Sequence, residues 1–226
     1  MGVVLTSSSV ALSWSGGKDS VLALRALRDE HGLDPGALVT TVTSSYDRVS
    51  MHGVRRSLLA SQADALGVPL VEVVIPPRCP NTVYEERWLD AFESGDLAGV
   101  EGMVFGDLFL EDVRSYREAL LARAGRRGLF PLWGRETARV AREFVAAGFR
   151  AVLVCVDPNQ LDRSFIGREF DASLLAELPA TVDPCGERGE FHTFVYAGPG
   201  FSETIQCRVG EVVERDGFVF SDLTAA

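Results

Sequence analysis

The sequence lacks several features that would define whole classes of protein. No apolar run approaches the ~20 residues of a membrane span, and the four cysteines are scattered, with no CxxC pair to indicate zinc or an iron–sulfur cluster. Basic residues are in deficit, 22 against 32 acidic ones, for a net charge of −10. Since nucleic-acid surfaces need clustered Lys and Arg, this argues against a nucleic-acid partner. The first basic residue is Lys18, so no signal peptide is expected, and a reduced, cytoplasmic chain is the simplest interpretation.

Repeats, low-complexity segments and a Pro/Ser-rich linker are also missing. The 226 residues are 46% hydrophobic and 24% charged, as is typical of a globular protein of one large or two smaller domains. We expect tightly packed parts with a soft boundary near Leu129–Trp133, giving domains over residues 1–130 and 131–226. Whether the chain forms a homo-oligomer is left open.

Apolar strand-like runs alternate with helical patterns through the first two thirds of the chain. This alternation predicts a Rossmann-like α/β fold, a parallel sheet with helices on both faces. The predicted strands after the first are Ala37–Ser44, Leu70–Ile75, Gly102–Phe105 and Ala151–Val156, and the helices between them include Val54–Leu66, Thr82–Glu93, Val113–Arg123 and Thr137–Ala147. Later come helical turns over Leu161–Glu177, short strands at Phe191–Tyr196 and Glu203–Val209, and a hairpin over Val212–Phe220, which predict a smaller α+β C-terminal part.

The chain is organised around the turn after its first apolar run, where Ser15-Gly16-Gly17-Lys18-Asp19-Ser20 precedes a helix. Glycines let backbone N–H groups turn inward, and a helix N-terminus adds unpaired donors and a positive dipole end, so the loop suits a phosphate. Ser15 and Ser20 add hydroxyls, and Lys18 adds a mobile positive charge. Asp19 fits either as a helix cap or as a Mg²⁺ ligand.

This loop is neither of the two commonest phosphate loops. The Walker pattern fails at Leu12 and at Asp19, and GxGxxG is absent. The six residues resemble the loop of the N-type ATP pyrophosphatases, which split ATP between the α and β phosphates, and this resemblance implies a Rossmann-like sheet of the HUP type.

A second polar stretch, residues 183–193, places three carboxylates, a cysteine, an imidazole and a hydroxyl among glycines. Three roles stay open: Mg²⁺ ligation by Glu187 and Glu190, acid–base work by His192, or a polar grip on a substrate. A solvated turn is the alternative. Cys185 is interpreted as a packed thiol rather than a nucleophile.

Three motifs together resemble the diphthine–ammonia ligase family: the loop at residues 15–20, Pro-Leu-Trp at 131–133, and Cys-Gly-Glu-x-Gly-Glu-Phe-x-Thr at 185–193. His192 stands where that family commonly has glutamate, a departure similar to uncharacterised bacterial relatives.

The resemblance implies that ATP and Mg²⁺ bind, a small-molecule or protein carboxylate attacks the α-phosphate, and ammonia displaces AMP to form an amide. The predicted nucleotide-binding residues are Ser13, Ser15, Gly16, Gly17, Lys18, Asp19, Ser20 and Ser44. The predicted catalytic residues are Lys18, Asp19, Asp107, Glu187 and Glu190, and the substrate-binding ones are Arg114, Glu187, Glu190, His192 and Thr193.

Several of these assignments have simpler alternatives. Asp107 could hold Mg²⁺ or cap the next helix, and Arg114 and Arg117 could meet a carboxylate or be merely solvated. The competing functions are sulfur transfer to tRNA, which needs catalytic cysteines and a basic face, and an ATP- or AMP-binding regulator without turnover. We also expect residues 185–193 to fold back over the carboxyl end of the sheet, next to Gly16–Ser20.

Overall fold

The computed structural model describes residues 5–45, 48–49 and 52–225. In chain order its elements are β1 (Val10–Ser13), α1 (Lys18–His31), β2 (Ala37–Thr43), β3 (Arg48–Val49), α2 (Arg56–Leu66), β4 (Leu70–Ile75), α3 (Asn81–Ser94), β5 (Gly102–Val104), α4 (Glu111–Arg123), β6 (Arg127–Leu129), α5 (Thr137–Ala146), β7 (Arg150–Val156), α6 (Ala172–Glu177), β8 (Phe191–Ala197), β9 (Cys207–Arg215) and β10 (Phe218–Ala225). Short 3-10 turns lie at Ser7–Ser9 and Arg163–Phe165.

The first part of the chain forms the expected parallel sheet. Strand β1 pairs in parallel with β2 on one side and with β5 on the other, while β4 extends the sheet beyond β2 and β6 beyond β5. The chain therefore builds outward from β1, then crosses back to start again at β5. Such a reversal leaves a crevice at the carboxyl end of β1, where open α/β sheets bind ligands.

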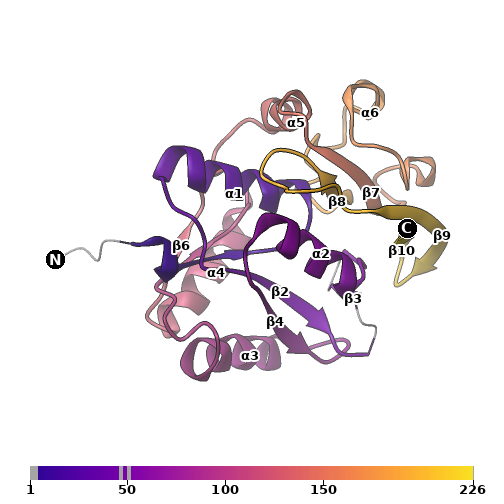
Figure 1. Cartoon of the computed structure of the whole chain (residues 1–226). Helices are drawn as coiled ribbons and strands as arrows, with labels where there is room; N and C mark the ends of the chain where they lie inside the picture. Colours follow the sequence, from indigo (N-terminus) through magenta and orange to yellow (C-terminus); the bar gives the residue numbers. More distant parts are fainter. Residues whose placement is uncertain (1–4, 46–47, 50–51, 226) are drawn as a thin grey trace.

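Helices cover both faces of this sheet because its strands alternate between two cores. Val10 and Leu12 pack with α1 and α2, whereas Ala11 packs with α3 and α4 on the opposite face. In Figure 1 helix α1 lies between the parallel sheet and the C-terminal part, and α3 lies on the outer side. The predicted fold class is confirmed.

The last part of the chain forms a separate antiparallel sheet with the order β8-β7-β10-β9. We expected Ala151–Val156 to continue the parallel sheet, and this expectation is wrong, because β7 pairs antiparallel with β8 and β10. All six of these residues are buried, and a strand buried on both faces has the same apolar pattern in either kind of sheet. The predicted hairpin is present, with Asp216 and Gly217 between β9 and β10.

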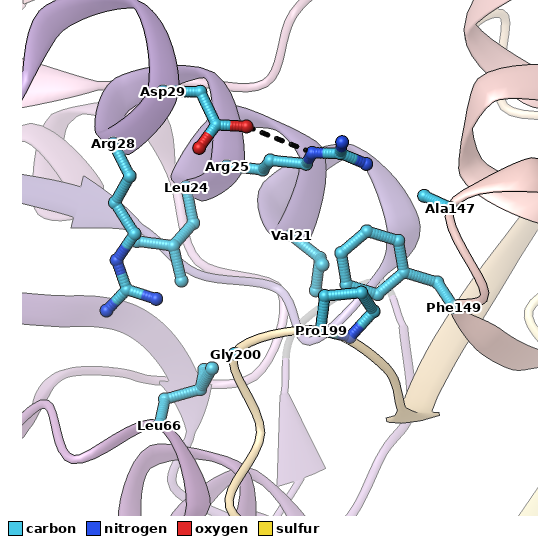
Figure 2. Close-up of a pocket in the computed structure, with 10 residues that line it drawn as sticks. All are labelled: Val21, Leu24, Arg25, Arg28, Asp29, Leu66, Ala147, Phe149, Pro199 and Gly200. Carbon is cyan, nitrogen blue, oxygen red and sulfur yellow. Dashed lines mark hydrogen bonds and ion pairs between the residues drawn. The ribbon is translucent and has the colours of Figure 1, made fainter.

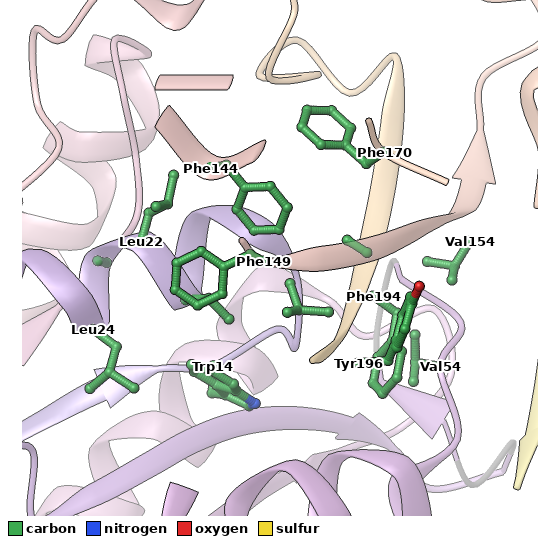
Figure 3. Packing of buried hydrophobic residues seen from close by; sticks show 14 of the residues in the cluster. Trp14, Leu22, Leu24, Val54, Phe144, Phe149, Val154, Phe170, Phe194 and Tyr196 are labelled. Carbon is green, nitrogen blue, oxygen red and sulfur yellow. The ribbon is translucent and has the colours of Figure 1, made fainter. Parts of the chain in front are cut away.

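One continuous core joins the two sheets. Trp14, Leu22 and Leu24 from the first part pack in the same cluster as Phe144, Phe149 and Phe194 from the second (Figure 3). Within the described residues no helix is long and apolar enough to cross a membrane. The proposed boundary near residue 130 falls between β6 and α5.

The sequence analysis did not predict β3 or β6, and it placed the start of β9 too early in the chain. β3 is only two residues long, and β6 consists of Arg-Gly-Leu, a composition without strand preference. Residues 203–206 lie outside β9, which begins at Cys207.

Candidate phosphate-binding site

The loop at residues 15–20 joins β1 to α1 as the sequence predicted. Gly16 has φ +76°, in the left-handed region, and a Cβ there would lie 2.7 Å from Gln62 Oε1. Gly17 precedes the first helical turn and donates its N–H to Ser15 Oγ at 3.2 Å, while Ser20 Oγ donates to Gly17 O at 2.8 Å. Only glycine meets both demands at position 16, so the loop keeps a shape that aims the helix N-terminus at a ligand.

Gln62 is a site residue that the sequence analysis missed. It is fully buried on α2 and accepts a hydrogen bond from Trp14 Nε1 at 2.9 Å. Its Nε2 donates to Gly16 O at 3.0 Å and to Val195 O at 2.5 Å. The sequence did contain a signal for this role, because a polar residue at an inward position of an amphipathic helix needs buried hydrogen-bond partners.

Strand β8 closes the loop from the side of the second sheet. Thr193 Oγ1 accepts a hydrogen bond from the backbone N–H of Lys18 at 3.1 Å, and Val195 N–H donates to Gly16 O at 2.9 Å. A Cβ on Gly17 would come within 3.0 Å of Thr193 O. The expectation that residues 185–193 fold back next to Gly16–Ser20 is confirmed.

Lys18 is not the mobile, exposed charge that we expected. It is 2% exposed, and its Nζ donates to Asp19 Oδ2 at 2.8 Å and to the carbonyl of Cys185. Its ammonium also lies 5.4 Å from the ring centroid of Phe191. Burial acts to lower the pKa of Lys18, but the surrounding negative groups, Asp19 foremost, together outweigh it and raise the pKa, so the lysine stays charged.

Asp19 lies in the first turn of α1, and the helix cap is Gly17, so the capping alternative is wrong. Burial raises the pKa of Asp19 although Lys18 opposes the shift. Its Oδ1 is buried and has no hydrogen-bond partner among the described residues. A carboxylate oxygen left in this way is ready for a ligand that the chain itself does not supply.

Glu187 ties the polar loop to the end of β5. Its Oε1 accepts hydrogen bonds from the backbone N–H groups of Leu108, at 2.7 Å, and Phe109, at 3.4 Å. Burial raises the pKa of Glu187 to about 7, reinforced by the negative charge of Asp19. A carboxyl group that titrates near neutrality suits proton transfer.

Glu190 is bonded within its own loop. It is 1% exposed, and its two oxygens accept the N–H groups of Asp183, at 2.8 Å, and Arg188, at 2.9 Å. Asp183 in turn accepts the N–H of Cys185 at 2.9 Å. This network shapes the loop, so the geometry favours a positioning role for Glu190.

The two arginines of α4 differ. Arg117 forms an ion pair with Asp107 at 2.8 Å, and its guanidinium lies 4.4 Å from the centroid of Phe105. Since α4 begins at Glu111 after Leu110, Asp107 does not cap it. Arg114 instead pairs with Glu118 and lies over the rings of Phe130 and Trp133. Asp107 follows β5, and Gly106 beside it is so close to α1 that a Cβ would lie 2.7 Å from Asp19 O.

The remaining predicted residues surround the same edge of the sheet. Ser13 ends β1, and Ser44 directly follows β2. The ring of His192 contacts that of His52 in a tilted arrangement, with centroids 4.3 Å apart. Burial and these neighbours, His52 and Lys18, hold the pKa of His192 well below its usual range, so the imidazole is neutral. Cys185 is 1% exposed, and burial keeps the pKa of its thiol far above the usual value, so it is a packed thiol.

Within the described part of the chain, no three His, Cys, Asp or Glu side chains are grouped to hold a metal by themselves. Mg²⁺ often takes one or two carboxylates and completes its shell with phosphate oxygens and water. The free oxygen of Asp19 fits that requirement.

A glycine-bearing turn before a helix N-terminus, at the strand reversal of a parallel sheet, defines a nucleotide-binding α/β protein of the PP-loop class. Residues 8–128 match the family described as "Diphthamide synthase N-terminal domain", and residues 136–220 match "Diphthamide synthase C-terminal domain". The chain belongs to the diphthamide synthase family.

Three similar proteins carry the name diphthine--ammonia ligase. The one from Schizosaccharomyces pombe is 25% identical over 229 residues, covering 89% of this chain and 36% of its own length. Those from Mus musculus and Danio rerio are 27% and 26% identical and cover 94% and 92% of this chain, and 87% and 89% of their own lengths. The chain thus spans about a third of the yeast protein (36%) and most of the other two. Family membership indicates an ATP-dependent, amide-forming enzyme.

Proposed function

We propose that this chain activates a carboxylate with ATP, releases pyrophosphate and transfers the acyl group to ammonia. The observation that carries the proposal is the ion pair between the buried Lys18 and the partly exposed Asp19 at the N-terminus of α1, which Thr193 and Cys185 contact. Burying one charge of a pair while one carboxylate oxygen stays unused costs stability, and ligand binding would offset that cost.

The phosphates of ATP would lie on the loop at residues 15–20. The backbone N–H of Lys18 is already bonded to Thr193, so the other N–H groups of the first turn of α1, together with the Lys18 ammonium, would stabilise the charge that develops on the leaving pyrophosphate. Asp19 would hold Mg²⁺ through Oδ1, and the ion would neutralise phosphate charge when bound. Ser13 and Ser44 lie at the carboxyl ends of β1 and β2, where the nucleoside would bind.

Glu187 is the candidate base for the second half of the reaction. The carboxylate substrate attacks the α-phosphorus, so that the α–β phosphoanhydride bond breaks and an acyl adenylate forms. The nitrogen of ammonia then attacks the acyl carbon, AMP leaves, and the amide nitrogen gives up a proton. A carboxylate with a pKa of about 7 can accept that proton near neutrality. Asp107, held by Arg117, is the alternative acceptor.

Sulfur transfer fits this site poorly. Cys155 and Cys185 are each 1% exposed, and burial raises the pKa of both thiols. The family to which the chain belongs leaves the acceptor open, whether a small molecule or a protein, and likeness to bacterial relatives remains a prediction.

The test is the position at which ATP is cleaved. With ATP labelled at the α-phosphate and a panel of carboxylic acids plus ammonium, the expected product is AMP, with equimolar pyrophosphate. The α,β-methylene analogue should inhibit, whereas the β,γ-methylene analogue should still react. ADP as the main product would contradict the proposal, and tight AMP binding without turnover would favour a regulator.

A further inference from the structure

A cavity of about 520 Å³ opens beside the phosphate loop, at the carboxyl ends of β2 and β4. Thr43 and Ile75 end these strands, and Phe218 and Phe220 of the β9–β10 hairpin line the side opposite. His192 also lines it, one residue before the Thr193 that binds Lys18. The volume suits a small molecule. We call this cavity the arginine cleft.

The charge of the cleft is opposite to that of the whole chain. Arg48, Arg78 and Arg215 line it, against one acidic described residue, Asp216, although the net charge of the chain is −10. Arg48 is held by Asp222 at 2.8 Å. For the exposed Arg78, no ion pair with another described residue is found. Guanidinium groups in a concave, partly apolar site favour an anion.

Backbone conformation marks the same place. Arg78 and Asp216 are the two described non-glycine residues with positive φ, both at 51°, and both line the cleft. Asp216 has an ordinary reason, because Asp-Gly is a favoured hairpin turn. Arg78 follows Pro76-Pro77 and has no such reason. Non-glycine residues held in the left-handed region cost free energy and concentrate at functional sites.

The cleft differs from two other places where a ligand could bind. Adenine and ribose carry no charge, so they do not use the Arg78 guanidinium. Because Ser44, which we assign to the nucleoside, directly follows the cleft residue Thr43, the nucleoside and the cleft ligand would be neighbours, and competition between the two ligands separates the sites. A second cavity of about 340 Å³ lies along the outer half of α1 (Figure 2). Both of its arginines are ion-paired, Arg25 with Asp29 and Arg28 with Asp34, whereas Arg78 of the arginine cleft has no ion pair with another described residue.

We propose that the arginine cleft holds the acceptor, and that the acceptor is a small carboxylic acid with an aromatic or apolar body and a second anionic group. The second anion lies against Arg78, the body lies on Phe218, Phe220 and Tyr84, and the reacting carboxylate extends past His192 toward the loop. The neutral imidazole of His192 offers the acid a hydrogen bond and adds no charge to the cleft. The identification of the bound acid as the acceptor rests on the proposed function, whereas the presence of an anion site does not.

The experiment compares two fluorescent probes that share one aromatic body. 8-Anilinonaphthalene-1-sulfonate is an anion, and N-phenyl-1-naphthylamine is the same molecule without the sulfonate. We expect the wild-type protein to bind the anionic probe about ten-fold more tightly than the neutral probe, because one charge-assisted contact supplies about that difference in affinity. Arg78→Ala should remove about that ten-fold for the anion and leave the neutral probe unchanged. Arg25→Ala, in the second cavity, is the matched control and should change neither.

A second readout places the probe. Cys79 lines the cleft and is half-buried, whereas Cys155 and Cys185 are buried. The anionic probe should slow alkylation of Cys79 by iodoacetamide, measured by mass spectrometry, in the wild type and not in Arg78→Ala. Equal affinity for the two probes, no effect of Arg78→Ala, or an unprotected Cys79 would each overturn the proposal.

The same probe separates this proposal from its rivals. Competitive displacement by α,β-methylene ATP would assign the cleft to the nucleotide and overturn it, whereas simultaneous binding supports it. If the cleft selects the anion while no acid yields AMP, the proposed function fails and the anion site stands. If AMP forms but the protein binds both probes equally well, the assignment of the cleft fails and the proposed function stands.

Discussion

The hydroxyl of Thr193 accepts the backbone N–H of Lys18 at 3.1 Å, although 175 positions separate the two residues. This bond places the second sheet directly on the first turn of α1, and it makes the phosphate site a product of both parts of the chain.

Thr193→Val should therefore destabilise the protein by about 1–3 kcal/mol, because a buried N–H loses its partner. Thr40→Val is the matched control, since Thr40 is equally buried at 2% but its hydroxyl has no partner among the described residues. That variant should be neutral or slightly stabilising. Urea unfolding measures both, and equal losses would contradict the role of the Thr193–Lys18 bond.

Lys18→Met should abolish ATP turnover and also lower the free energy of unfolding. Removing one partner of a buried pair leaves a charge uncompensated, at a cost of about 3–5 kcal/mol. The lower end applies here, because Asp19 retains 30% side-chain exposure. The double variant Lys18→Met/Asp19→Asn should regain most of the stability and none of the turnover. A double variant as unstable as the single one would argue against the pair as the cause.

Glu187→Gln should change the pH dependence of stability. An unfolded glutamate titrates near 4.3, whereas burial raises the folded pKa of Glu187 to about 7. Between these values the native state binds more protons than the unfolded state, so this group's contribution to stability falls as pH rises. The melting temperature of Glu187→Gln relative to wild type should rise from pH 5 to pH 8. A difference that stays constant over that range would show that Glu187 titrates normally.

Gln62→Leu should unfold at a distinctly lower urea concentration than wild type. The change leaves Trp14 Nε1 and the carbonyls of Gly16 and Val195 without their side-chain partner. Each buried group left unsatisfied costs about 1–3 kcal/mol, less where another bond remains. Gln206→Leu, at an exposed position, is the control and should stay within about 0.5 kcal/mol of wild type. A Gln62 variant as stable as this control would contradict the bridging role.

Local sequence patterns predicted the parallel sheet and its loop because both depend on neighbours in the chain. Val10–Ser13 is an apolar strand, Gly16 and Gly17 permit the turn, and Gly32 ends the helix in the left-handed region. The density of carboxylates in the polar loop also predicted its position next to the phosphate loop, while a functional role for the polar loop stays a prediction. These signals lie within a few residues of one another.

What the sequence could not predict depends on distant partners. The burial of Lys18 follows from the Cys185 carbonyl and the rings of Phe170 and Phe191, all far along the chain. The role of Glu190 depends on the folded shape of its own loop. The place of β7 depends on its pairing with β8 and β10, which lie far along the chain. The inward position of Gln62 on its helix was visible in the sequence, but its partners were not, because they lie in the β1–α1 connection and on β8.

The carbonyl of Gly16 accepts hydrogen bonds from Gln62 on α2 and from Val195 on β8. One backbone oxygen thus holds together the loop, a helix of the first part and a strand of the second. Because one core cluster also joins the two sheets, heat should melt the protein in a single cooperative step. A fragment ending near residue 130 would keep the phosphate-loop sequence but lose its partners on β8, so we predict that nucleotide binding at the loop requires a piece that includes β8.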